Sequence, residues 1–174
     1  MGMNNTTQLE TLAAELIQQL TQRKQSVAVA ESCTGGLLGA ALTAIPGSSA
    51  VVQGGVIAYA NEIKQNLLGV PTDLITRFGA VSEEVALSMA TQVRTRCNAT
   101  WGLATTGIAG PSGGSPEKPV GMVWVAIAGP QDSKAVCKIF QGDRNEIRMA
   151  TVQYIVNAVL SSMRTQKYTC SFEQ

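Results

Sequence analysis

The order in which apolar runs and helical repeats follow one another is the strongest constraint on how this chain folds. Apolar residues recur at helical spacing through 9–20, and a short apolar run follows at 27–30. That run stops at a polar cluster with two glycines, after which 37–45 again has a helical pattern. A run of β-branched and aromatic residues at 51–60 then leads to Asn61, a good N-cap for a short helix.

The second half of the chain repeats this alternation and then departs from it. Ser82 and the two glutamates after it predict the start of a helix, and 101–106 predicts the strand that follows. Two further strands are predicted at 121–128 and 134–141, and Asp143 predicts the start of a last helix. Strands that alternate with helices and end in a strand pair predict an α/β layered domain with a mixed sheet.

The length predicts a single domain over 1–174. A chain of 174 residues that is 45% hydrophobic can bury a core without disulfides or metals. We expect this core to span 7–164 and a loose tail to occupy 165–174. The polar start lacks the basic and then apolar order of a signal peptide, and the apolar stretch at 120–128 is too short to cross a bilayer. We therefore expect a cytoplasmic protein with no membrane partner.

The absence of histidine from the sequence excludes several kinds of site. Ser-His-Asp and Cys-His catalysis, His-ligated zinc and imidazole pH switches all require that side chain. The cysteines, at 33, 97, 137 and 170, are too scattered for a metal cluster or a disulfide framework and are expected to be reduced. A net charge of +1 offers no basic field to a nucleic-acid backbone. We thus expect no metal, no cofactor and no nucleic-acid partner.

Two loops that follow predicted strands are the candidate ligand sites, because ligands bind at the carboxyl edge of such sheets. The first, 31–36, reads Glu-Ser-Cys-Thr-Gly-Gly and begins a helix, where free N–H groups hold an oxyanion or a phosphate. The second, 105–114, is rich in glycine and lets backbone amides approach a ligand closely. A plain helix cap and a flexible loop are the respective alternatives.

A nucleophilic serine at position 32 would need a base, and without imidazole the candidates are a neutral lysine, helped by a tyrosine. Tyr59 and Lys64 flank the junction of a strand and a short helix, so one turn aims both into the same cleft. Burial or a nearby cation would have to lower the lysine pKa from about 10.4 to roughly 7 to 8. A solvated surface lysine is the ordinary alternative. Cys33 is a rival nucleophile, although a buried spectator thiol is its more usual role.

Arg144 stands at the predicted start of the last helix, where the helix dipole does not favour a cation. A specific anionic partner would explain its position, and an ordinary surface arginine is the alternative.

Seven segments together resemble the C-terminal domain of the competence-damage-inducible CinA family. They occur in the family's order across roughly residues 7 to 164, and so many ordered motifs make a chance match improbable. The segments are Ala30-Glu31-Ser32-Cys33-Thr34-Gly35-Gly36, Pro46-Gly47-Ser48-Ser49, Tyr59-Ala60-Asn61-Glu62-Ile63-Lys64, Gly79-Ala80-Val81-Ser82, Gly107-Ile108-Ala109-Gly110-Pro111 with Gly113-Gly114, Lys118-Pro119-Val120-Gly121, and Gly142-Asp143-Arg144.

The stand-alone members of this family are nicotinamide-nucleotide amidases. The resemblance implies a three-layer α/β/α fold with a mixed, mostly parallel sheet. It also implies hydrolysis of nicotinamide mononucleotide to nicotinate mononucleotide and ammonia, in pyridine-nucleotide recycling. Ser32 takes the family's nucleophile position, and Tyr59 and Lys64 take the positions associated with its activation. The N-terminal domain of longer members, to which a pyrophosphatase activity is assigned, has no counterpart in this sequence.

The expected substrate contacts lie in three regions, and the sequence leaves open which of them holds the oxyanion and which the phosphate. They are Thr34, Gly35 and Gly36 at the helix start, Thr106, Gly107 and Gly110 in the glycine-rich loop, and Arg144.

Two other functions remain open from the sequence. A cysteine-dependent hydrolase would use Cys33, and a nucleotide-binding or regulatory module would bind a pyridine mononucleotide without turning it over. We also expect a homo-oligomer, with a dimer formed through apolar surface on the predicted strand pair.

Overall fold

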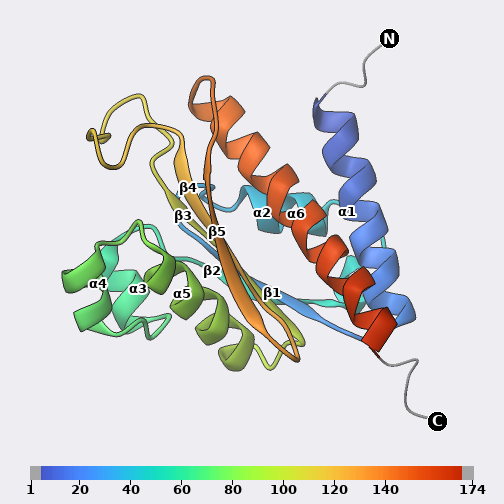
Figure 1. The fold of residues 1–174 in the computed structure, drawn as a ribbon. Helices are drawn as coiled ribbons and strands as arrows, with labels where there is room; N and C mark the ends of the chain where they lie inside the picture. Colours follow the sequence, from blue (N-terminus) through green and yellow to red (C-terminus); the bar gives the residue numbers. More distant parts are fainter. Residues whose placement is uncertain (1–4, 170–174) are drawn as a thin grey trace.

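In the computed structural model, which describes residues 5–169 and the side chains of 6–165, five strands form one sheet covered by helices on both faces (Figure 1). The strands are β1 (Val27–Glu31), β2 (Val52–Ile57), β3 (Trp101–Gly107), β4 (Met122–Ala128) and β5 (Ser133–Ile139), and their order is β2-β1-β3-β4-β5. β1 runs parallel to β2 and β3, whereas β4 is antiparallel to both of its neighbours. The predicted mixed sheet is confirmed, and its parallel part is the three strands that lead into the site.

Two helical layers enclose this sheet, as expected for an α/β/α fold. One face carries α1 (Asn5–Gln22), α2 (Leu37–Thr43) and α6 (Arg144–Thr169), and the other carries α3 (Asn61–Asn66), α4 (Thr72–Phe78) and α5 (Glu83–Arg96) (Figure 1). The central strand β1 is buried along its whole length. Its valines pack into the core beneath α1, α2 and α6, and its alanines pack beneath α5, because successive side chains of a strand face opposite sides.

α5 begins at the predicted cap. Ser82 Oγ accepts a hydrogen bond from Val85 N at 3.4 Å and donates one to the Gly79 carbonyl at 2.8 Å. Val85, Met89 and Val93 recur every four residues and are fully buried against the sheet. α5 therefore follows from its cap and its apolar stripe.

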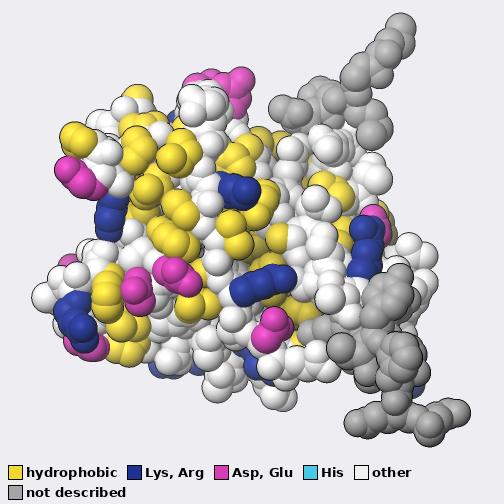
Figure 2. Space-filling model, viewed as in Figure 1, with side chains coloured by type: hydrophobic (Ala, Val, Ile, Leu, Met, Phe, Trp, Pro, Cys, Tyr) yellow, Lys and Arg dark blue, Asp and Glu magenta, His cyan; other side chains and the backbone are white. Residues whose placement is uncertain are grey.

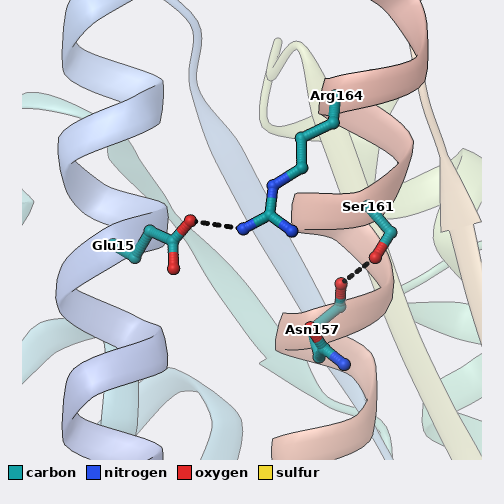
Figure 3. A network of polar contacts seen from close by, with 4 residues as sticks. All are labelled: Glu15, Asn157, Ser161 and Arg164. Carbon is teal, nitrogen blue, oxygen red and sulfur yellow. Dashed lines mark hydrogen bonds and ion pairs between the residues drawn. The ribbon is translucent and has the colours of Figure 1, made fainter.

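α6 also begins at the predicted cap but ends later than predicted. Asp143 Oδ1 accepts from the amides of Asn145 and Glu146, and Glu146 Oε2 accepts from the amide of Asp143. The helix continues to Thr169, so the prediction of a loose tail is wrong for 165–169. α6 packs along α1. Arg164 of α6 bonds Glu15 of α1 at 2.7 Å (Figure 3). Positions 170–174 of the predicted tail lie outside the described residues.

The face that carries β5 has an apolar surface. Figure 2, drawn from the same side as Figure 1, shows hydrophobic side chains gathered there. On this edge strand Val136 and Ile139 are 38% and 54% exposed. The dimer expected on this strand pair stays a prediction. Among the helices of residues 5–169, none has both the length and the apolar character needed to cross a membrane.

Candidate active site

Ser32 and Lys64 meet at the carboxyl ends of β1 and β2. Ser32 is the first residue after β1, and Lys64 lies in the short helix that follows β2. Lys64 Nζ donates a hydrogen bond to Ser32 Oγ at 3.0 Å, and it also donates to the carbonyls of Ala58, at 2.8 Å, and Tyr59, at 3.2 Å. Lys64 is only 1% exposed and Ser32 is 8% exposed. The structure thus brings together the predicted nucleophile and one of its two predicted activators.

The surroundings of Lys64 act on the charge of its amine. Burial lowers the pKa of Lys64 below its usual value, and the nearby Cys33 thiol opposes this shift. All three hydrogen-bond partners of Nζ are uncharged oxygens, and no carboxylate bonds it within residues 6–165. The lowered pKa makes this amine a better candidate proton acceptor than an exposed lysine.

Glu31 organises the turn that carries Ser32. It is the last residue of β1, is 1% exposed, and its carboxylate accepts hydrogen bonds from the amides of Gly36, at 3.0 Å, Leu38, at 3.0 Å, and Gly39, at 2.7 Å. This carboxylate therefore does the work of an N-cap for α2, whose own cap residue has no side chain to offer. The turn also needs glycine at 35 and 36, because their φ angles are 60° and 96°.

Two of the three amides that the sequence suggested for the oxyanion, those of Gly35 and Gly36, are occupied within the turn. The amide of Gly35 donates to the Ser32 carbonyl, and the amide of Gly36 donates to Glu31. Thr34 is fully buried, and its hydroxyl lies 2.7 Å from the hydroxyl of Thr105. The structure thus places Thr34, Gly35 and Gly36 next to Ser32 as parts of a self-contained turn.

Gly107 ends β3 beside the same turn. Ser32 N donates to the Thr105 carbonyl at 2.9 Å, which is the last rung between β1 and β3. Ile108 uses both its amide and its carbonyl on the β4 side. Because peptide groups alternate sides along a strand, the amide of Gly107 points past that last rung toward Ser32.

Thr106 and Lys118 hold the turn before α5. The Thr106 hydroxyl is buried and donates to the Ala80 carbonyl at 2.7 Å. Lys118 Nζ donates to the carbonyls of Phe78, at 2.9 Å, and Val81, at 2.7 Å. The Gly79–Ser82 and Lys118–Gly121 motifs are thus explained by contacts between them. Thr106 was predicted as a ligand contact, but its hydroxyl already donates to the Ala80 carbonyl.

Tyr59 and Arg144 form a bridge at the edge of the site. Arg144 Nη2 donates to the Tyr59 hydroxyl at 2.8 Å, and Nη1 donates to the Gly110 carbonyl at 2.7 Å. Tyr59 is 58% exposed, and it reaches Lys64 only through its backbone carbonyl. Arg144 also lines a hollow of about 530 Å³ together with Ala109 and Val120. Gly110 and Arg144 are therefore joined, whereas the Tyr59 hydroxyl bonds neither Ser32 nor Lys64 in the described structure.

Cys33 lies in the core beside the site. It is 6% exposed, and burial raises the pKa of its thiol to about 12. A thiol with this pKa is almost entirely protonated at neutral pH and is a poor nucleophile. This geometry disfavours the cysteine-dependent alternative.

Arg148 is a site residue that sequence reasoning missed. Its Nε and Nη2 atoms donate to the Thr34 carbonyl at 3.2 and 2.8 Å. Arg148 follows Arg144 by four residues, so both project from the same side of α6. That spacing was the signal available in the sequence.

Comparison with known proteins identifies the family. The model of the CinA C-terminal domain matches residues 9–163. A CinA-like protein of Prochlorococcus marinus subsp. pastoris is 50% identical over 156 residues, which cover 89% of this chain and 36% of that protein. A CinA-like protein of Gemmatimonas aurantiaca is 56% identical over 144 residues, or 83% of this chain and 34% of that protein. The chain thus spans about a third of the length of these curated relatives.

Solved structures agree with this comparison over almost their whole length. The competence/damage inducible protein CihA from Agrobacterium tumefaciens is 43% identical, with a TM-score of 0.83 over 88% of this chain and 94% of that one. A competence-damaged protein (CinA) superfamily protein from Klebsiella pneumoniae is 30% identical, with a TM-score of 0.87 over 90% and 98% of the two chains. The chain therefore belongs to the CinA C-terminal domain family.

Proposed function

We propose that this domain is an amidohydrolase in which Ser32 is the nucleophile and Lys64 is its general base. The observation that carries the proposal is the 3.0 Å contact between Lys64 Nζ and Ser32 Oγ, made by a lysine that is 1% exposed. Burial lowers the pKa of this lysine, so a neutral amine is available at a distance suited to proton transfer.

The reaction needs one proton carrier. Neutral Lys64 takes the proton of the Ser32 hydroxyl as Oγ attacks the carbonyl carbon of a carboxamide. The oxygen of the tetrahedral intermediate then accepts a hydrogen bond from the Gly107 amide at the end of β3, a contact of a kind often worth roughly 3 to 4 kcal/mol. The ammonium of Lys64 returns its proton to the departing nitrogen, which leaves as ammonia. Lys64 then deprotonates a water molecule that attacks the acyl-enzyme, and it returns this proton to Ser32 Oγ as the ester bond breaks and the acid leaves.

Nicotinamide mononucleotide is the substrate we propose, and the exposed groups beside the dyad support it. Tyr59 offers an exposed aromatic ring, and Arg144 offers a guanidinium at the edge of the hollow. The exposed Tyr59 ring, held by its hydroxyl to Arg144, suits the pyridine ring, and the guanidinium suits the 5′-phosphate. The family resemblance points to the same substrate, whose recycling would take place in the cytoplasm.

Tyr59 has a binding role in this proposal. Its hydroxyl bonds Arg144, so proton transfer runs between Ser32 and Lys64 without a relay. The Arg144–Tyr59 bond also fixes the guanidinium above the hollow, which limits the entropy lost when the phosphate binds.

The deciding experiment measures ammonia released from nicotinamide mononucleotide. Ser32→Ala and Lys64→Met should each lose roughly 10³-fold or more in kcat while keeping the wild-type fold. Ser48→Ala is a matched control, because Ser48 is 7% exposed but lies in the turn before β2, outside the proposed reaction path. A fully active Ser32→Ala variant would exclude the serine mechanism. Saturable binding in calorimetry without any ammonia would instead favour the nucleotide-binding module.

A further inference from the structure

Arg148 projects from a buried stretch of α6 toward the turn that carries Ser32. The neighbouring α6 residues Ile147 and Thr151 are 1% and 0% exposed, so this stretch of the helix is fixed in the core. From there Arg148 reaches a segment more than a hundred residues earlier and donates through Nε and Nη2 to the Thr34 carbonyl. No Asp or Glu side chain bonds Arg148 within residues 6–165. Its recorded partner is thus the backbone of the Ser32 turn.

The turn that carries Ser32 is bound by two side chains of opposite charge, Glu31 and Arg148. The Glu31 carboxylate binds the amides of Gly36, Leu38 and Gly39, whereas the Arg148 guanidinium binds the carbonyl of Thr34. Hydrogen bonds to charged groups are stronger than neutral ones, so these two side chains restrain both ends of the turn. The backbone hydrogen bonds within the turn are longer than the bonds to Glu31. They measure 3.1 Å for Gly35 N to Ser32 O and 3.3 Å for Leu37 N to Thr34 O.

We propose that Arg148 is a positioning residue for Ser32. By fixing the Thr34 carbonyl two residues beyond the nucleophile, it keeps the turn in the arrangement that aims Ser32 Oγ at Lys64 Nζ. Releasing that carbonyl would let the turn relax around its two glycines, and a misplacement of about 1 Å can cost roughly 10²-fold in rate. The inference rests on the proposed function.

A role in binding the phosphate would give a different result, and the experiment separates the two. Ammonia release is measured with nicotinamide mononucleotide and with nicotinamide riboside, which lacks the phosphate. The variants are Arg148→Met, Arg148→Lys and the control Arg164→Met, which removes another α6 arginine that bonds Glu15 far along the helix (Figure 3). In parallel, a fluorophosphonate probe measures the reactivity of Ser32 itself, with Ser32→Ala as the blank.

We expect kcat to fall roughly 30- to 100-fold in Arg148→Met, with KM within about twofold and the same loss for both substrates. Arg148→Lys should lose less, about 10-fold, because a lysine keeps the charge but offers a single donor point. Ser32 labelling should slow by similar factors, and Arg164→Met should match the wild type.

Three outcomes would overturn the inference. These are an unchanged kcat in Arg148→Met, a loss confined to KM for the phosphorylated substrate, and unchanged Ser32 labelling. A wild-type protein that releases no ammonia would refute the proposed function, and the labelling rates would then decide the role of Arg148 alone. If Arg148→Met does not fold, Arg148→Lys decides the same question.

Discussion

Lys64 Nζ lies 3.0 Å from Ser32 Oγ inside the protein, and its other two hydrogen-bond partners are backbone carbonyls. Neither carbonyl can neutralise an ammonium, so burial acts on the amine without the compensation that a carboxylate would give. Lys64 Nζ is therefore within hydrogen-bonding distance of Ser32 Oγ and has a lowered pKa. These are the two properties that a base for serine needs.

The pH dependence of the reaction follows from that pKa. Because only neutral Lys64 accepts the serine proton, kcat/KM should rise with pH and level off above a midpoint lower than the usual lysine value of about 10.4. We expect no change in kcat/KM from an ionisation near pH 6.5, since the sequence has no histidine. Initial rates of ammonia release across the pH range provide the measurement. A rate that is flat from about pH 6 to 10 would speak against Lys64 as the base.

Stability should respond to pH through the same group. A lysine with a lowered folded-state pKa binds fewer protons in the native protein than in the unfolded chain, between that pKa and about 10.4. Wild-type stability should therefore rise with pH across this window, relative to Lys64→Met, by at most about 1.4 kcal/mol per pH unit. Below the lowered pKa, both states are protonated and the difference should be constant. Denaturant titrations of both proteins at several pH values measure it, and parallel curves throughout would contradict the lowered pKa.

Tyr59→Phe tests the role of the tyrosine. Since the hydroxyl bonds Arg144 and not Ser32 or Lys64, we expect kcat within about threefold of wild type and a KM raised roughly 3- to 10-fold by loss of a hydrogen bond to a charged group. Steady-state kinetics with nicotinamide mononucleotide separate the two constants. A fall in kcat of about 10²-fold or more would instead show that the tyrosine takes part in proton transfer.

Gly107→Ala tests the oxyanion contact. A Cβ at this position would lie 2.6 Å from the Met122 carbonyl oxygen and 2.8 Å from Val123 Cα, so the end of β3 must shift. We expect a destabilisation of about 1 to 3 kcal/mol and a loss of roughly 10²-fold in kcat as the amide moves.

Gly47→Ala is the matched control for that variant. Its φ of 85° makes alanine unfavourable by about 1 to 2 kcal/mol, but nothing lies within 4 Å of the added Cβ. It should lose stability and keep its kcat. Equal activity losses in the two glycine variants would show that destabilisation alone accounts for the effect.

Cys33→Ala should remain active. Its thiol has a pKa of about 12 and is 6% exposed, so it is neither ionised nor accessible enough to act as a nucleophile. Removal of the buried sulfur should cost about 1 kcal/mol of stability, measured by denaturant unfolding. Loss of activity in this variant, together with rapid inactivation of the wild type by a thiol alkylator, would restore the cysteine mechanism.

The sequence predicted elements whose signals are local. The caps at Ser82 and Asp143 lie at the starts of α5 and α6, because a cap depends on residues within one turn. α4 was not predicted, because its seven residues include none that is buried and so show no apolar stripe. The extension of α6 past residue 165 was also missed, since it follows α1, a partner far away in the sequence.

The site was predictable in its residues and not in its contacts. Ser32 and Lys64 stood out by residue type and loop position, but the 3.0 Å distance between them depends on how β1 and β2 pair. The sequence could not show that Glu31 occupies the helix amides, because that carboxylate folds back on its own chain. It could equally not show that Arg148 reaches the Thr34 carbonyl, 114 residues earlier in the chain.

The strand order β2-β1-β3 has a consequence that does not depend on any catalytic residue. The chain leaves β1 through α2 to reach β2 on one side, and then returns across α3, α4 and α5 to place β3 on the other. The winding of the sheet therefore reverses at β1, and the connections that leave neighbouring strands must part there toward opposite faces. A crevice at the end of β1 is thus a by-product of topology. Different residues at that crevice could change the chemistry performed there. Moving the crevice itself would require a different order of strands.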